Sequence, residues 1–280
     1  MNVMLLSGSG GGEHQENLTL GDWIMHHLQD SQAWHELGIE HFPSFPPIHI
    51  LGMEVDLSIT KHVVMMWLAL AVLILLFKLA FRRKQQVPGG MAGALESMVL
   101  FVRDEIAVPN MGRALGSKMT PFLCSLFFFI LTCNLFGLIP SFSTATGNIA
   151  VTAGLAIITF VLTQLYGIKE NGIGGYLKHL APPGLPLPMY IIIIPIEILS
   201  LFTKPFALAM RLFANMVAGH TVIFALLGLI IILGHVAVAT VSVPLAMAIY
   251  FLELFVAFLQ AYIFVILSAL FIGMSAHPEH

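Results

Sequence analysis

The chain has few charged residues. Charged side chains make up 10% of its 280 residues and hydrophobic ones 58%, whereas soluble domains carry about 25% charged residues. This composition excludes a soluble or disordered chain and predicts an integral membrane protein. Its 12 Lys and Arg are outnumbered by 15 Asp and Glu, so the chain lacks the basic surface that a nucleic-acid-binding protein needs.

Cysteine is also scarce. The two cysteines, Cys124 and Cys133, lie nine residues apart in one apolar run. Nine steps of about 100° place them on opposite faces of a helix, so they cannot form a disulfide with each other. A disulfide-stabilised scaffold is therefore excluded, and we interpret both cysteines as core residues.

Several catalytic and transport patterns are missing. Without an HExxH sequence the chain is not a typical intramembrane metalloprotease, and it contains no phosphate-binding loop. We predict no cofactor and no metal site. The internal repeat of secondary transporters is missing as well, although a polytopic secondary ion transporter with an intramembrane Arg/Glu/His site remains the alternative function.

Residues 1–60 are acidic and contain many histidines. They hold eight Asp and Glu but no Lys or Arg. Their first twelve residues have no basic region and no long apolar stretch, so they do not resemble a signal peptide. The histidines are open to two interpretations, a solvated exterior segment or a group that binds metal or buffers protons, and no spacing matches a ligand motif. They are His14, His26, His27, His35, His41 and His49.

The charge pattern predicts an orientation and a fold class. Arg82, Arg83 and Lys84 directly follow the first long apolar run, so the positive-inside rule places the N-terminus outside and the following segment in the cytoplasm. We expect an all-α polytopic membrane protein with about five membrane helices and a cytoplasmic amphipathic helix. The predicted segments are 1–60 (exterior), 61–84 (first membrane helix), 85–118 (cytoplasmic amphipathic segment), 119–168 (membrane hairpin), 169–188 (cytoplasmic loop), 189–275 (long tilted helix pair carrying the ion path) and 276–280 (cytoplasmic tail).

The last third of the chain has two unusually long apolar runs, 189–233 and 236–275. A helix of 40 residues is about 60 Å long, twice the thickness of the hydrocarbon core. Such helices must tilt steeply, bend, or run partly along the membrane. Pro195, Pro205 and Pro244 are candidate bend points.

Ionisable residues within these runs are candidate functional residues, because each is costly in hydrocarbon. Glu197, Lys204 and Arg211 are seven residues apart, so they form one polar stripe along a helix. Asn215 lies about 40° from Arg211 on the same helix, and His220 lies on the opposite face. A fixed cation and a titratable imidazole therefore face different neighbours.

The second run contains Glu253 and Gln260, which also share a helix face. Structural interpretations remain open for several of these residues. Arg211 could form an ion pair with Glu197 or Glu253, and Lys204 could extend to the membrane interface. His220 could be a core histidine, and Gln260 could simply hydrogen-bond between helices.

Four segments resemble the a subunit of the rotary F-type ATP synthase, and the resemblance covers about residues 50–275. These segments are SLFTKPFALAMRLFANMVAGH (200–220), AIYFLELFVAFLQAYIFVILSALF (248–271), TCNLFGLIPSFSTATGNIAVT (132–152) and NGIGGYLKHL (171–180). The resemblance implies a non-catalytic, ion-translocating stator with two aqueous half-channels that serve the carboxylates of a rotating c-subunit ring. It also implies b subunits of a peripheral stalk and the remaining ATP synthase subunits as partners, the lipid bilayer as surroundings, and the bacterial plasma (inner) membrane as location with a cytoplasmic C-terminus.

By resemblance, Arg211 matches the family's essential arginine, Asn215 its neighbouring asparagine, and Glu197 and Gln260 its polar partners. His220 and Glu253 depart from the best-known bacterial members, which have a glutamate and a histidine at these positions. The pair nevertheless keeps one carboxylate and one imidazole, which are candidates for delivering protons from the outer water because imidazole titrates near neutral pH. Gly137 likewise replaces an acid that some relatives have, which suggests that Asn134 or Asn148 lines the hairpin side instead.

Overall fold

The computed structural model describes residues 48–50, 53–55, 58–82, 89–139, 142, 144–180 and 187–276. Most of these residues are helical, and a short antiparallel hairpin pairs Ile48 with Val55. The predicted exterior segment up to residue 47, with most of its histidines, and the tail beyond Ala276 lie outside the described residues. The elements are β1 (Ile48–Ile50), β2 (Met53–Val55), α2 (Lys61–Ala80), α3 (Met91–Phe101), the π-helix η2 (Val102–Ala107), α4 (Val108–Gly137), the 3-10 helix η3 (Ala145–Gly147), α5 (Ile149–Leu180), α6 (Leu187–Leu233) and α7 (Val236–Ala276).

The prediction of an all-α polytopic membrane protein is confirmed. Five helical stretches within the described part are long and apolar enough to cross a membrane. They are Lys61–Ala80, Met91–Gly137, Ile149–Tyr176, Met189–Ile230 and Ala237–Ala276. Helices α6 and α7 have 47 and 41 residues, which agrees with the two overlong apolar runs in the sequence.

The cytoplasmic amphipathic helix predicted over 85–118 is not confirmed. The chain from Met91 to Gly137 instead forms one apolar helical stretch of 47 residues, with α4 continuing through residue 118. The direction of the chain changes within α4 at Gly112, where φ is 76°. Only glycine adopts such a conformation at little cost. Because hydrophobic periodicity carries no information about glycine conformation, it does not predict this break.

The predicted cytoplasmic loop over 169–188 is helical in its first part. Helix α5 continues to Leu180 and contains a break at Gly172, where φ is 68°. The density of glycine indicates a loop in the sequence. A single glycine at the break is enough to redirect the chain, so the residues on either side keep their helical hydrogen bonds.

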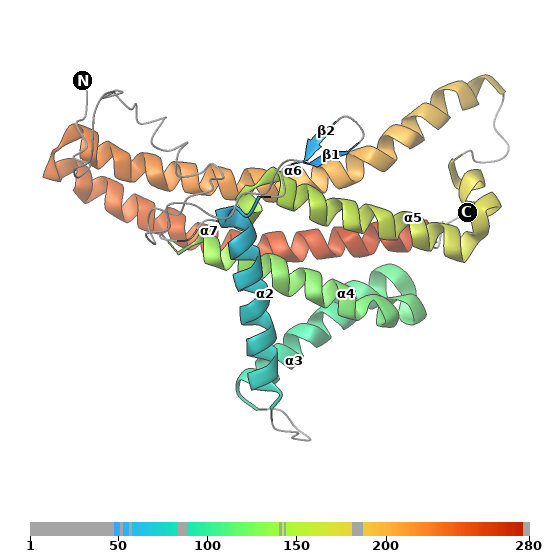
Figure 1. The fold of residues 1–280 in the computed structure, drawn as a ribbon, viewed down its shortest axis with the longest axis horizontal. Helices are drawn as coiled ribbons and strands as arrows, with labels where there is room; N and C mark the ends of the chain where they lie inside the picture. The colour runs from blue at the N-terminus through green and yellow to red at the C-terminus, as the bar shows by residue number, and fades with distance from the viewer. Residues whose placement is uncertain are drawn as a thin grey trace. The chain divides into compact units, whose positions relative to one another are not determined.

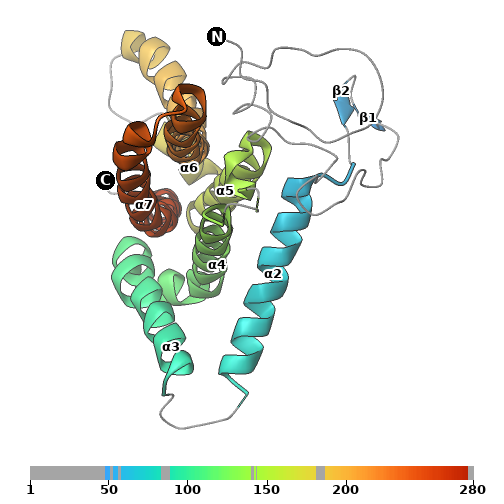
Figure 2. The same cartoon turned by 90° about the vertical axis from the view of Figure 1, so that its left-hand side faces the viewer.

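The chain divides into two compact units, and both contain parts of α6 and α7. The first unit comprises Met1–Lys61 and Asn215–Val256, and the second comprises His62–Ala214 and Ala257–His280. Within the second unit, α2 runs across α4 and α5 rather than alongside them (Figure 1, Figure 2). The ring of Phe77 on α2 meets that of Phe128 on α4 edge to face, with 5.1 Å between their centroids.

The core of the second unit lies around α4. Phe127 is fully buried and packs edge to face against Phe258 of α7, with 5.8 Å between ring centroids. Further along α7, a Cβ added to Gly273 would overlap the carbonyl oxygen of Asn110. Only a hydrogen fits there, so the glycine allows α7 and α4 to approach closely.

The C-terminal end of α7 is held by α5. The side-chain amide of Asn171 donates to the carbonyl oxygens of Ser275 and Ala276, at 3.0 and 3.2 Å. The last carbonyls of a helix have no partner within the helix. Asn171 therefore provides from α5 the hydrogen bonds that a C-cap residue usually provides.

Candidate ion-translocation site

In the first unit, α6 and α7 bring His220 and Glu253 into direct contact. Nδ1 of His220 lies 2.6 Å from Oε1 of Glu253, and the two side chains are 13% and 4% exposed. Sequence spacing places these residues on two separate helices, and only the resemblance links them. The structure pairs His220 with an acid, so it is not simply a histidine surrounded by apolar core.

Gly219 makes room for this pair. A Cβ at Gly219 would lie 2.7 Å from Oε1 and 2.8 Å from Cδ of Glu253, closer than such atoms approach in proteins. The carboxylate therefore occupies the space that any other residue would fill. Sequence reasoning misses Gly219, although its position directly before the candidate histidine is a usable signal.

The pair has the chemistry to hold and release a proton. A buried carboxylate without a partner is strongly disfavoured in an apolar environment. A protonated imidazole at 2.6 Å supplies an opposite charge, and a neutral imidazole offers its nitrogen lone pair to a protonated carboxyl group. In both arrangements the pair carries one proton that either side chain can hold.

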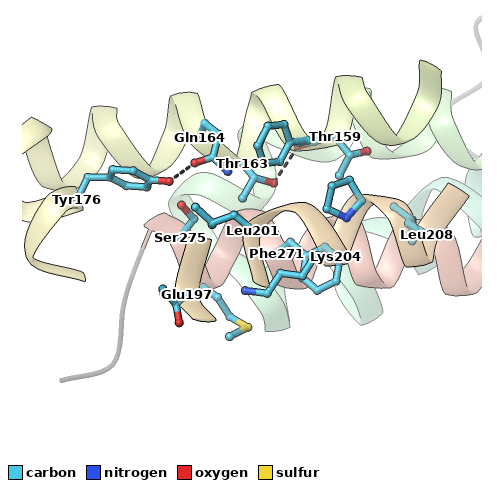
Figure 3. Close-up of a pocket in the computed structure, with 13 residues that line it drawn as sticks. Thr159, Thr163, Gln164, Tyr176, Glu197, Leu201, Lys204, Leu208, Phe271 and Ser275 are labelled. Atoms are coloured by element: carbon cyan, nitrogen blue, oxygen red, sulfur yellow. Dashed lines mark hydrogen bonds between the residues drawn. The ribbon is translucent and has the colours of Figure 1, made fainter. Parts of the chain in front are cut away.

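The second unit contains a small cavity of about 50 Å³ whose mostly apolar wall carries several polar side chains. Glu197 and Lys204 of α6 line it together with Gln164 and Tyr176 of α5 and Ser275 of α7, as Figure 3 shows. A cavity needs roughly 10–15 Å³ to hold one water molecule. This cavity therefore has room for a few water molecules beside ionisable groups.

Two contacts order the wall of this cavity. The hydroxyl of Tyr176 donates a hydrogen bond to Oε1 of Gln164 (Figure 3). The ammonium of Lys204 lies 5.8 Å from the ring centroid of Phe271, within the range of cation–π attraction. The polar stripe predicted from the spacing of Glu197 and Lys204 thus forms one side of a pocket that can hold water.

Arg211, the third member of that stripe, has an exposed side chain. Among the residues that the structure describes, it makes no hydrogen bond or ion pair, so the structural pair with Glu197 that the sequence left open is not formed there. Asn215 is half-buried on the same helix in the first unit. Gln260 on α7 in the second unit is buried, with 6% of its surface exposed.

A buried polar chain joins the hairpin to α7 beside Gln260. Asn134 donates from Nδ2 to the carbonyl oxygen of Ala257 at 3.1 Å, and Thr146 donates to Oδ1 of Asn134 at 2.7 Å. Thr144 lies 3.1 Å from Thr146, oxygen to oxygen. In the sequence these threonines belong to a short polar turn between two apolar runs, which gives no sign that their hydroxyls are buried. Asn148, the other candidate, accepts a local bond from the Ala150 amide at 2.9 Å.

The comparison with known families settles what kind of protein carries these groups. The family model described as ATP synthase A chain matches residues 63–273. The chain belongs to the ATP synthase A chain family.

Individual members of the ATP synthase A chain family agree with this assignment over most of their length. ATP synthase subunit a of Myxococcus xanthus is 60% identical over 229 residues, which is 80% of this chain and 75% of the relative. The subunit a of Anaeromyxobacter dehalogenans is 50% identical, covering 95% of this chain and 72% of the relative. The subunit a of Chloroherpeton thalassium is 51% identical, covering 91% of this chain and 77% of the relative.

Family membership confirms the prediction of a membrane-sector a subunit of F-type ATP synthase. The protein is a multi-pass membrane subunit that belongs to an ATP synthase complex with other subunits. The secondary-transporter alternative is not favoured.

Proposed function

We propose that Arg211 is the fixed charge of this stator and that it faces the carboxylates of a rotating c-subunit ring. The observation that carries the proposal is its exposed, unpaired side chain on an apolar helix, among the residues that the structure describes. A guanidinium is costly in hydrocarbon unless an anion or water meets it. A rotor carboxylate supplies that anion.

Arg211 acts through its permanent charge. Because guanidinium stays protonated at any accessible pH, it does not relay protons itself. A rotor carboxyl group travels neutral through lipid, and a cation about 4 Å away favours its charged form by about 4 kcal/mol at an effective dielectric of about 20. This attraction corresponds to roughly three pKa units, so the rotor group releases its proton on reaching Arg211.

The proposed proton path has two ends. On the outer side, His220 and Glu253 take a proton from water and pass it to a rotor carboxylate. On the cytoplasmic side, the proton released near Arg211 leaves through water in the cavity lined by Glu197 and Lys204. Asn215 and Gln260, polar groups on the same two helices, line the proton path. A transmembrane potential of 100 mV contributes about 2.3 kcal/mol per charge moved.

The bacterial inner membrane as location and the individual partner subunits belong to the same proposal. The three relatives named above are bacterial, which supports the bacterial inner membrane. Arg82, two residues after the end of α2, supports a cytoplasmic end for that helix and hence an external N-terminus. The b subunits of the peripheral stalk complete the set of membrane partners.

The test is ATP-driven proton pumping in inverted membrane vesicles that contain the Arg211→Ala complex. We expect pumping to be abolished while the subunit still co-purifies with the complex, because the change removes a charge at an exposed position. Arg113→Ala is the matched control, since Arg113 is also exposed but lies on α4, and it should pump normally. Normal pumping by Arg211→Ala would overturn the assignment.

A further inference from the structure

Two polar regions of the second unit lie at different levels along α7. The first, which we call the Asn134 region, comprises Gln260 and the buried chain from Thr146 through Asn134 to the carbonyl of Ala257. The second is the cavity that reaches Ser275. Gln260 and Ser275 are 15 residues apart, which is about 22 Å along a helix. Whatever lies between these levels decides whether the two regions communicate inside the subunit.

The cavity closes at two hydroxyl groups. Thr159 and Leu208 lie at the opposite end of the cavity from Tyr176 and Glu197 (Figure 3). There Oγ1 of Thr159 lies 3.3 Å from Oγ of Ser268. Each hydroxyl also donates to a carbonyl of its own helix, at 3.2 Å from Thr159 and 2.7 Å from Ser268. Because both hydroxyl protons already have acceptors, neither group needs a water molecule beyond this end.

Apolar side chains separate this end from the Asn134 region. Gln260 and Ser268 are eight residues apart on α7, which is about 12 Å along the helix. The buried side chains between these levels carry no polar atom and belong to one hydrophobic core. We call them the dry stretch: Ala156 of α5 and Ala261, Phe264 and Val265 of α7.

The burial of the dry stretch is internal to the chain. Each of its four side chains is at most 2% exposed, and other subunits of the complex can only cover more of the surface. Protons cross proteins along connected water molecules or titratable side chains. An apolar interior stays free of water, so the dry stretch provides neither.

Arg211 cannot block a route through the interior. Its side chain is exposed, and in the proposed function it acts at the surface that faces the rotor. A proton that passed through the core from the Asn134 region to the cavity would cross the membrane without moving the rotor. The stator therefore needs a second barrier at a different place.

We propose that the dry stretch is this internal barrier, and that it keeps protons of the Asn134 region out of the cytoplasmic cavity. Phe264 is its largest side chain, and it lies four residues from Gln260 and four from Ser268, so it occupies the turn between the two polar levels. The proposal rests on the proposed function, because a barrier matters only if both regions carry protons.

The test measures passive proton leak in proteoliposomes that contain the purified ATP synthase complex. Each rotor carboxylate is replaced by its amide, which closes the rotor route, and a dye trapped in the vesicles follows the decay of an imposed pH gradient. We expect Phe264→Ser and Val265→Asn each to speed this decay several-fold, because each adds a polar group and room for water. Either variant suffices if the other fails to assemble. Decay at the wild-type rate in the assembled variants would overturn the proposal.

Matched variants separate a wet path from a loosened structure. Phe264→Leu and Val265→Ala also leave space but keep it apolar, and an apolar void stays dry, so neither should leak. Met65→Asn places a polar group at a buried position of α2, outside both polar regions, and should not leak. Equal leaks in all of these variants would indicate general loosening and refute the barrier.

A second-site variant tests where the leak ends. Thr163→Leu places an apolar group in the wall of the cavity, so it should suppress the leak of Phe264→Ser. An undiminished leak would show that the protons leave elsewhere and would refute the proposed route.

Failure of the barrier is distinguishable from failure of the proposed function. If Arg211→Ala abolishes pumping but neither polar variant leaks, only the barrier is wrong. If Arg211→Ala pumps normally, the proposed function is wrong whatever the polar variants do.

Discussion

The two polar sites on α6 and α7 differ in how they are built. In the first unit, His220 and Glu253 touch directly at 2.6 Å with little exposed surface. In the second unit, Glu197 and Lys204 line a cavity of about 50 Å³ that several other polar side chains share. A direct contact is lost when either partner is changed, whereas water in a cavity can form hydrogen bonds in place of a side chain that has been removed. The pair should therefore tolerate substitution far less than the cavity.

The largest effect should come from breaking the pair. Glu253→Leu should reduce ATP-driven pumping by on the order of 10²-fold, the usual range for losing a positioned proton-transfer group, and His220→Leu should do the same. Pumping in vesicles, normalised to the amount of assembled complex, is the measurement. A loss smaller than that of any cavity variant would reverse the comparison.

Exchanging the two residues sharpens the same comparison. We expect His220→Glu combined with Glu253→His to retain more pumping than either single change, because the exchange keeps one carboxylate and one imidazole. A double-mutant cycle on the pumping rates measures the coupling between them. A double variant no better than the worse single variant would show that the residues do not act as a pair.

A smaller loss should follow from crowding the pair without removing it. Gly219→Ala places a methyl group 2.7 Å from Oε1 of Glu253, and overpacking of this kind costs about 1–3 kcal/mol. We expect pumping to fall roughly tenfold, and Glu253→Asp in the same chain to recover part of it by withdrawing the carboxylate. Gly154→Ala on α5 is the control, since nothing lies within 4 Å of an added Cβ there.

The cavity should respond weakly to single changes. Lys204→Met and Glu197→Gln should each slow pumping only about two- to threefold, because water can bridge the remaining polar groups at a cost below about 2 kcal/mol. The double variant should slow pumping by more than the product of the two single fold reductions. A hundredfold loss from either single variant would mean that this region works like the buried pair.

The smallest effect on pumping should come from the polar chain beside Gln260. Thr146→Val removes the donor to Asn134 and leaves a buried amide oxygen without it, which costs about 1–3 kcal/mol. We expect the complex to dissociate at a lower temperature while pumping changes less than about twofold. Thr203→Val is the control, because its hydroxyl is exposed and bonds within α6. An equal shift in both variants would contradict a role for the buried chain.

Helical spacing in the sequence predicts part of the site. The seven-residue intervals place Glu197 and Lys204 on one stripe, and both line one cavity. The lengths of the two apolar runs predict α6 and α7. Composition likewise predicts the membrane fold class.

Contacts between helices cannot be predicted from spacing. Nothing local shows that Gly219 accommodates the carboxylate of Glu253, since the two residues belong to different helices. The sequence places Thr144 and Thr146 in a short polar turn between two apolar runs, and nothing in that pattern shows that their hydroxyls are buried beside Asn134. The break at Gly112 escapes prediction because a positive φ leaves no mark on an apolar pattern.

The hydrogen bonds from Asn171 to the end of α7 have a practical consequence for protein engineering. Because an amide from α5 satisfies the carbonyls of Ser275 and Ala276, the helix does not need the residues that follow it to end cleanly. A purification tag or fluorescent fusion joined after Ala276 should leave α7 in register. The same fusion combined with Asn171→Ala should loosen that end, so position 171 is the one to leave unchanged when a fusion partner is attached.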